Sequence, residues 1–297
     1  MARGPYAAIA AAIVAVSTAS ILIRWSDSDA FTIAFYRLGF ATLIILPFAL
    51  LDRATPLRSL LRRDVLLMAG IGVVLAAHFA LWITSLKTAG VTVASSVVLV
   101  TSHPVMVALV SHFLLKERVS RMTAAGIALG FAGVVGIAVA DLGVSTTTLG
   151  GDLAALGGGL MAGIYFLAGR RLRQRVSLPV YAFVVYGTAA LAMFVLALGT
   201  GRLAPVGDVR RELLLFGAMA IIPQIGGHTL YNWSLRFVTA PVVSVSLVGE
   251  PIGSSLLAWA LLGEVPSNLV AIGALLALAG IFLTAYSTGA GAPIALP

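Results

Sequence analysis

A single carboxylate interrupts the apolar segment 239–262 of this chain. Ten of the 11 Asp and Glu residues lie at the ends of apolar segments or between them, and Glu250 is the exception. It lies 11 residues after Thr239 (250 − 239), or about 16 Å along a helix. If this segment crosses a bilayer, that depth is close to the midplane, where a carboxylate usually faces a cavity, a partner or a proton path. Glu250 is therefore a candidate for binding an amine or carrying a coupled proton.

A structural ion pair is the alternative role for Glu250. Arg37 is the natural partner, because it is the only basic residue well inside an apolar segment. A proline follows Glu250 directly, and another follows His103. Each proline leaves one backbone carbonyl without its helical donor. Pro104 and Pro251 are therefore predicted helix breaks or hinges, and the freed carbonyls could line a polar cavity.

Other polar and aromatic side chains recur at helical spacing. Gln224, His228 and Tyr231 share one helix face at i, i+4 and i+7, and His78 and Trp82 do so at i and i+4. The alternative for each is structural, because hydroxyls often bond their own helix and single His or aromatic residues often only pack. The predicted substrate-binding set is His78, Trp82, Ser96, His103, Tyr165, Gln224, His228, Tyr231, Ser244, Ser246 and Glu250.

These side chains belong to a chain whose composition predicts a lipid environment. Hydrophobic residues make up 60% of the 297 residues, and charged residues only 10%. A soluble protein of this length could not bury so much apolar surface. The net charge of +8 resides in short basic clusters between apolar segments, so we predict no nucleic-acid partner. The chain has no Cys, and its four His form no cluster, so no metal or other cofactor is predicted.

Ten segments are long and apolar enough to span a bilayer, which takes about 20 residues. The sequence predicts an all-α integral membrane protein with spans at residues 6–24, 31–51, 65–86, 91–115, 122–140, 151–170, 179–199, 212–235, 239–262 and 267–286.

The basic residues predict an orientation for these spans. With the first residue on the cytoplasmic side, 13 of the 19 Lys and Arg lie inside, five lie outside and Arg37 lies within a span. Positive charge favours the cytoplasmic side, so both termini are predicted there. The predicted location is the bacterial cytoplasmic (inner) membrane.

The two halves of the chain repeat each other at an interval of 147 residues. In this register Pro104 meets Pro251, Glu117 meets Glu264, and Gly126 meets Gly273 in the segment that follows. Each repeat would hold five helices, and an odd number inverts the second copy in the membrane. Inverted repeats around a midplane site are typical of secondary transporters. The predicted units are a first repeat at residues 1–140, a second at 150–287 and a flexible cytoplasmic tail at 288–297.

Two motifs carry a resemblance to a known family. SHPVMVALVSHFLLKE (102–117) and GEPIGSSLLAWALLGE (249–264) each have a central proline and a final Glu, and AFYRLGF (34–40) has an Arg in the second span. With these motifs the chain resembles the EamA family of the drug/metabolite transporter superfamily. The resemblance implies ten helices, an inner-membrane location and export of small metabolites or drugs.

The sequence thus favours a secondary transporter, not an enzyme, that exports small amphipathic molecules such as amino acids by alternating access. No Walker motif is present, so ATP would not drive it directly. The predicted partners are a small-molecule substrate, the lipid bilayer and a proton, with a monomer or weak homodimer as the assembly. The alternatives are an intramembrane enzyme using His and Ser, for which no GxSxG motif exists, and a channel-like facilitator.

Overall fold

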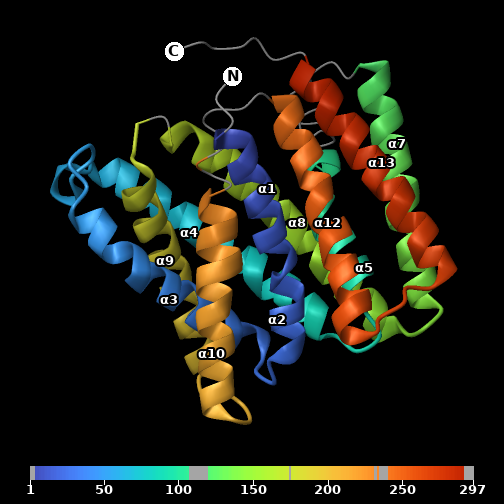
Figure 1. Cartoon of the computed structure of the whole chain (residues 1–297), viewed down its shortest axis with the longest axis horizontal. Coiled ribbons are helices and arrows are strands. Elements are labelled where there is room, and N and C mark those ends of the chain that lie inside the picture. Colours follow the sequence, from blue (N-terminus) through green and yellow to red (C-terminus); the bar gives the residue numbers. More distant parts are fainter. Residues whose placement is uncertain (1–3, 107–119, 174, 231–232, 234–239, 291–297) are drawn as a thin grey trace.

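The computed structural model describes residues 4–106, 120–173, 175–230, 233 and 240–290, and within these ranges every regular element is helical. The helices form one bundle, in which the start of α1 and the end of α13 lie at the same end, the upper one in Figure 1. In chain order the elements are α1 (Gly4–Ser17), α2 (Ala19–Trp25), α3 (Ala30–Leu50), η1 (Leu57–Ser59), α4 (Arg62–Lys87), α5 (Val93–Thr101), α7 (Arg121–Leu142), α8 (Thr146–Leu172), α9 (Leu178–Gly199), α10 (Val209–Met219), the π-helix η2 (Ala220–Thr229), α12 (Ala240–Leu262) and α13 (Asn268–Ala290).

Seven helical segments in the described part of the chain are long and apolar enough to cross a membrane, and each overlaps a predicted span. The other three predicted spans, 91–115, 212–235 and 239–262, each include residues outside the described ranges. The total of ten therefore stays a prediction. The seven segments are Ala7–Trp25, Ala30–Leu50, Arg62–Lys87, Arg121–Leu142, Thr146–Gly169, Leu178–Gly199 and Asn268–Ser287.

Polar residues at the predicted breaks begin the helices. The Asp29 carboxylate accepts from the backbone N–H of Phe31 at 2.9 Å and so caps α3. Asp208 caps α10 in the same way. Ser120 caps α7 by accepting from the N–H of Thr123 at 3.0 Å. Such caps satisfy N–H groups that a helix leaves unpaired at its start, which fixes where each helix begins.

Helix starts recur at the interval of the sequence repeat. Arg62 begins α4, and Val209 begins α10, 147 residues later (209 − 62). The equivalent helices α7 and α13 pack along each other, as do α3 and α9. The inversion of the second copy stays a prediction. The same interval of 147 separates the starts of α7 and α13 (Arg121, Asn268).

Small residues allow α7 and α13 to approach closely. A Cβ on Gly133 would lie 2.7 Å from the Cα of Ala277, and one on Gly280 would lie 2.7 Å from the carbonyl oxygen of Gly126. Close contact through small residues is a common way for membrane helices to associate. This glycine ladder therefore packs two helices of the same chain.

Gly133→Val should destabilise the protein by about 1–3 kcal/mol, because the new side chain overlaps the α13 backbone, which cannot move aside. The measurement is the midpoint of thermal unfolding in detergent. Gly39→Ala in α3 is the matched control, since a Cβ there meets no atom within 4 Å. Equal melting temperatures for the two variants would contradict the assigned helix contact.

Candidate functional site

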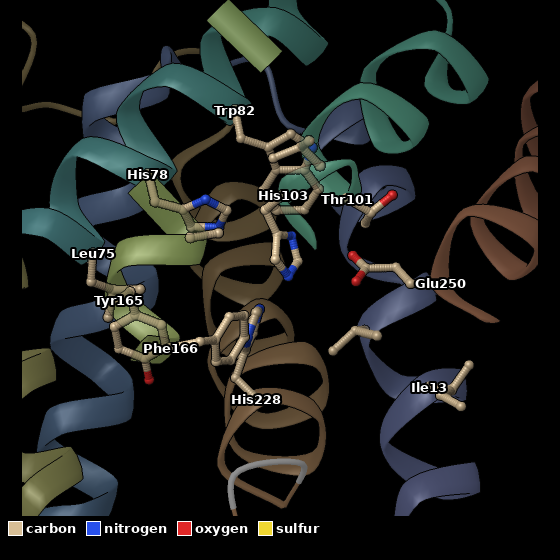
Figure 2. A pocket seen from close by; sticks show the side chains of 13 residues that line it. Ile13, Leu75, His78, Trp82, Thr101, His103, Tyr165, Phe166, His228 and Glu250 are labelled. Atoms are coloured by element: carbon tan, nitrogen blue, oxygen red, sulfur yellow. The ribbon is translucent and has the colours of Figure 1, made fainter. Parts of the chain in front are cut away.

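A cavity lies inside the bundle where α1, α4, α5, α8, η2 and α12 face one another (Figure 2). Among the described residues, its lining combines aromatic rings, three imidazoles, apolar side chains, one hydroxyl and a single carboxylate. The lining residues are Ile13, Val16, Leu75, His78, Trp82, Val100, Thr101, His103, Ala162, Tyr165, Phe166, His228 and Glu250.

Glu250 supplies the carboxylate of this cavity. Its oxygens point into the cavity beside Thr101 and on the side of His103 (Figure 2). The side chain is only partly buried, whereas Thr101 and His103 are buried. A carboxylate that opens on a cavity can bind a cation or take up a proton without moving a helix.

Aromatic rings form two walls of the cavity. His78 stacks on Trp82 with ring centres 6.0 Å apart, and His103 stacks on Phe166 at 5.6 Å. His78 Nδ1 donates to the carbonyl of Gly158 at 2.9 Å, which fixes the orientation of its ring. The walls can therefore stack on a flat apolar group held between α4, α5 and α8.

The two prolines act differently on their helices. α5 ends at Thr101, before Pro104, whereas α12 continues through Pro251. Val100 lies four residues before Pro104, so its carbonyl has no helical donor. That carbonyl instead faces Gly159 of α8, where a Cβ would lie 2.6 Å from the oxygen. The hinge role of both prolines stays a prediction.

Arg37 lies behind the cavity and does not pair with Glu250. Both residues are described, and no ion pair within 4 Å joins them. Instead, Arg37 Nε donates to Gln224 Oε1 at 2.9 Å, and the guanidinium lies 4.3 Å from the centre of the Phe79 ring. The expected ion pair is therefore absent from this conformation.

A polar network joins several helices where the C-terminal ends of α2 and α12 lie close together. Arg24 of α2 forms an ion pair at 3.4 Å with Glu264, which follows α12. The other Glu264 oxygen accepts from the N–H of Val93 at 2.8 Å, at the start of α5. Arg24 also donates to the carbonyl of Val91. We call Arg24, Glu264 and the backbone of Val91 and Val93 the Arg24–Glu264 clasp.

A buried carboxylate, that of Glu212, strengthens this end of the bundle. Glu212 of α10 accepts from the hydroxyl of Ser28 at 2.7 Å and from the N–H of Asp27 at 2.9 Å. Lys87 donates to the carbonyl of Ser26 at 2.5 Å and so ties α4 to the same loop. The sequence places Glu212 at the end of a span, but only the structure shows it accepting hydrogen bonds from the loop after α2.

The family model of EamA-like transporters matches the chain twice, over residues 4–139 and 149–286. The chain belongs to the EamA-like transporter family. It is therefore a multi-pass membrane protein of a transporter family.

Two curated relatives share the length of this EamA-like chain. Both are named "Uncharacterized transporter" and come from Archaeoglobus fulgidus. One is 28% identical over 274 residues, covering 89% of this chain and 90% of the relative. The other is 25% identical over 281 residues, with coverages of 93% and 94%. A solved crystal structure, 23% identical, superposes with a TM-score of 0.62 over 96% of this chain and 98% of that one, which supports the fold alone.

The structure brings six of the predicted site residues together at the cavity. They are His78, Trp82, His103, Tyr165, His228 and Glu250.

The remaining predicted residues do not line the described cavity or cannot be placed. Ser96 bonds the hydroxyl of Ser85 at 2.9 Å, and Gln224 bonds Arg37. Tyr231 and the side chains of Ser244 and Ser246 lie outside the described residues. Their roles stay predictions.

Three polar or aromatic residues of the site are not predicted from the sequence. Thr101 and Phe166 line the cavity, and Phe79 lies between the cavity residues and Arg37. Thr101 has a usable signal, since it precedes the His103–Pro104 break by two residues. A phenylalanine in a membrane helix carries no such signal, because lipid-facing and cavity-facing rings look the same in a sequence.

Proposed function

We propose that this protein is a secondary transporter that exports small amphipathic metabolites across the cytoplasmic membrane by alternating access. Amino acids with aromatic or apolar side chains are the first substrate class, and cationic drugs are the second. The observation that carries the proposal is the cavity itself, which combines aromatic walls with one carboxylate in the interior of a membrane bundle.

Each part of the cavity suits one part of such a substrate. Glu250 would receive the amine, since it is the one acidic residue among the described side chains that line the cavity. Trp82 and Phe166 would contact the apolar side chain, because each already stacks on an imidazole at the cavity wall. An aromatic substrate is named first because of this lining.

Alternating access requires that one end of the cavity closes while the other opens. The Arg24–Glu264 clasp joins the ends of α2, α5 and α12, and of these helices α5 and α12 line the cavity. The predicted orientation places this clasp on the outer side. Breaking it would free these helices to separate there, and this opening would release the substrate. Protonation of Glu250 is the proposed coupling step, with facilitated diffusion as the alternative.

Counterflow in liposomes tests this function. Purified protein is reconstituted with unlabelled compound inside, and labelled tryptophan, threonine and a quaternary amine are offered outside, each in a separate experiment. Labelled tryptophan should accumulate transiently above its equilibrium level, which a channel cannot produce. Absence of counterflow for amino acids and cations under every imposed gradient would contradict the proposal.

A further inference from the structure

Arg37 is the most unusual charged residue of the described chain. Its side chain is 0% exposed. Nε donates to Gln224, but among the described residues neither Nη1 nor Nη2 has a hydrogen-bond partner, and the amide nitrogen of Gln224 also lacks one there. A buried guanidinium without an anion costs several kcal/mol. The fold therefore holds three unsatisfied donor groups side by side despite this cost.

All three groups are donors, which limits what could satisfy them. A hydroxyl or an amine would bring further donors of its own, whereas an ionised carboxylate only accepts. A planar carboxylate also matches the fork of a guanidinium, which can donate to both of its oxygens. The chemistry of this cluster thus selects a carboxylate.

One aromatic layer separates this cluster from the cavity. The Arg37 guanidinium lies on one face of Phe79 at 4.3 Å. His228 meets the Phe79 ring edge-on at 5.9 Å, and His78 lies 4.8 Å from it, both measured between ring centres. Both imidazoles line the cavity. Rotation of the Phe79 or His228 side chain would therefore expose the donors to a molecule in the cavity.

The element that carries Gln224 and His228 is suited to such a movement. η2 (Ala220–Thr229) is a π-helix and contains Pro223, so its hydrogen-bonded turns are wider than those of the helix before it. π-Helical turns occur often at functional sites, and returning to α-helical winding shifts the side chains that follow. Gln224 and His228 would then move together relative to Arg37.

We propose that Arg37, assisted by Gln224, binds the carboxylate of the transported amino acid. The inference rests on the proposed function, because it assigns the second charged group of the same substrate. Glu250 and Arg37 then hold opposite ends of a zwitterion, and the apolar side chain lies between the aromatic walls. This arrangement also explains why Arg37 does not pair with Glu250: a direct ion pair would occupy both recognition groups.

The test compares ligands that differ only in the carboxylate. Binding of tryptophan and tryptamine, and of phenylalanine and phenethylamine, is measured with purified protein in detergent. The wild type should bind each amino acid at least about tenfold more tightly than its amine, a fold-change typical of losing one good polar contact. Equal affinity for both members of each pair overturns this inference and leaves the proposed function standing. Binding of neither member in either pair overturns both.

Gln224→Glu places a carboxylate of the protein itself beside Arg37. The variant should melt at a higher temperature than the wild type, because the buried charge gains a partner. Its affinity for tryptophan should fall to that for tryptamine, while tryptamine binding changes little. Gln224→Met, which removes the amide without adding charge, is the comparison variant: it loses one of the three donors, so its preference for the amino acid should weaken but stay above that of Gln224→Glu. An unchanged preference in Gln224→Glu overturns the proposal.

A separate measurement distinguishes a site for the carboxylate of the substrate from a site for any small anion. Sodium acetate and sodium chloride are tested for stabilisation of the wild type and of Gln224→Glu. If either salt at millimolar concentration raises the melting temperature as much as tryptophan does, the cluster is a site for small anions in general and the substrate assignment fails. Stabilisation by the amino acid alone supports it.

Discussion

Glu250→Gln is expected to abolish amino-acid export driven by a pH gradient while leaving equilibrium exchange in place. Glutamine keeps the shape of the side chain and resembles the neutral, protonated acid, but it cannot take up or release a proton. Because Glu250 is the carboxylate that opens on the cavity, proton-coupled flux should fall by about tenfold or more. The measurement is uptake of labelled tryptophan into inverted vesicles, with and without a pH gradient, beside exchange at equal pH.

Asp208→Asn is the matched control for this result. Asp208 is an exposed cap at the start of α10, and asparagine caps helices equally well, so the variant loses one carboxylate without losing the fold. It should transport like the wild type in both assays. If Glu250→Gln also behaves like the wild type with the pH gradient present, Glu250 is a structural polar group and the coupling step lies elsewhere.

Breaking the Arg24–Glu264 clasp is expected to open the cavity from its side of the membrane. The clasp is partly exposed, yet it joins three helices at one point, and Glu264 also holds the start of α5 through the N–H of Val93. The natural chain contains no Cys, so Thr101→Cys introduces a unique thiol at the cavity wall. When Arg24→Ala is added to Thr101→Cys, a membrane-impermeant maleimide should label this thiol about tenfold faster than in the chain that carries Thr101→Cys alone.

Exchanging the two charges tests whether the Arg24–Glu264 ion pair itself keeps the cavity closed. The double variant Arg24→Glu/Glu264→Arg restores opposite charges at the same two positions, so labelling of Thr101→Cys should slow again relative to either single variant. Equal labelling rates in the natural, Arg24→Ala and exchanged backgrounds would contradict a gating role. Labelling from the other side of the membrane alone would contradict the predicted orientation.

The sequence predicts functional residues best at positions where a residue type is energetically costly in its surroundings. A carboxylate deep in an apolar segment has few acceptable environments, so the interest of Glu250 is visible without a structure. Helical spacing alone predicts His78 and Trp82, because four residues return a side chain to the same face. The segments between predicted spans contain Asp29 and Asp208, which the structure shows capping α3 and α10.

Contacts between helices lie beyond such reasoning. The expected Arg37–Glu250 pair is plausible from depth, but the structure places Gln224 beside Arg37 instead. Ser96 has the spacing of a site residue, yet its hydroxyl bonds Ser85 on the neighbouring helix. Rotation of a helix by a fraction of a turn decides such cases, and periodicity does not encode the rotation.

Photolabelling tests the central claim, that this cavity holds the transported molecule, most directly. A diazirine analogue of phenylalanine would be bound to the purified protein, activated by light, and its attachment sites mapped by mass spectrometry. We predict attachment on α4 near Trp82, on α5 near Thr101 and on α8 near Phe166, all suppressed by excess unlabelled substrate. Suppressible attachment confined to other helices, in protein that still transports, would contradict this claim.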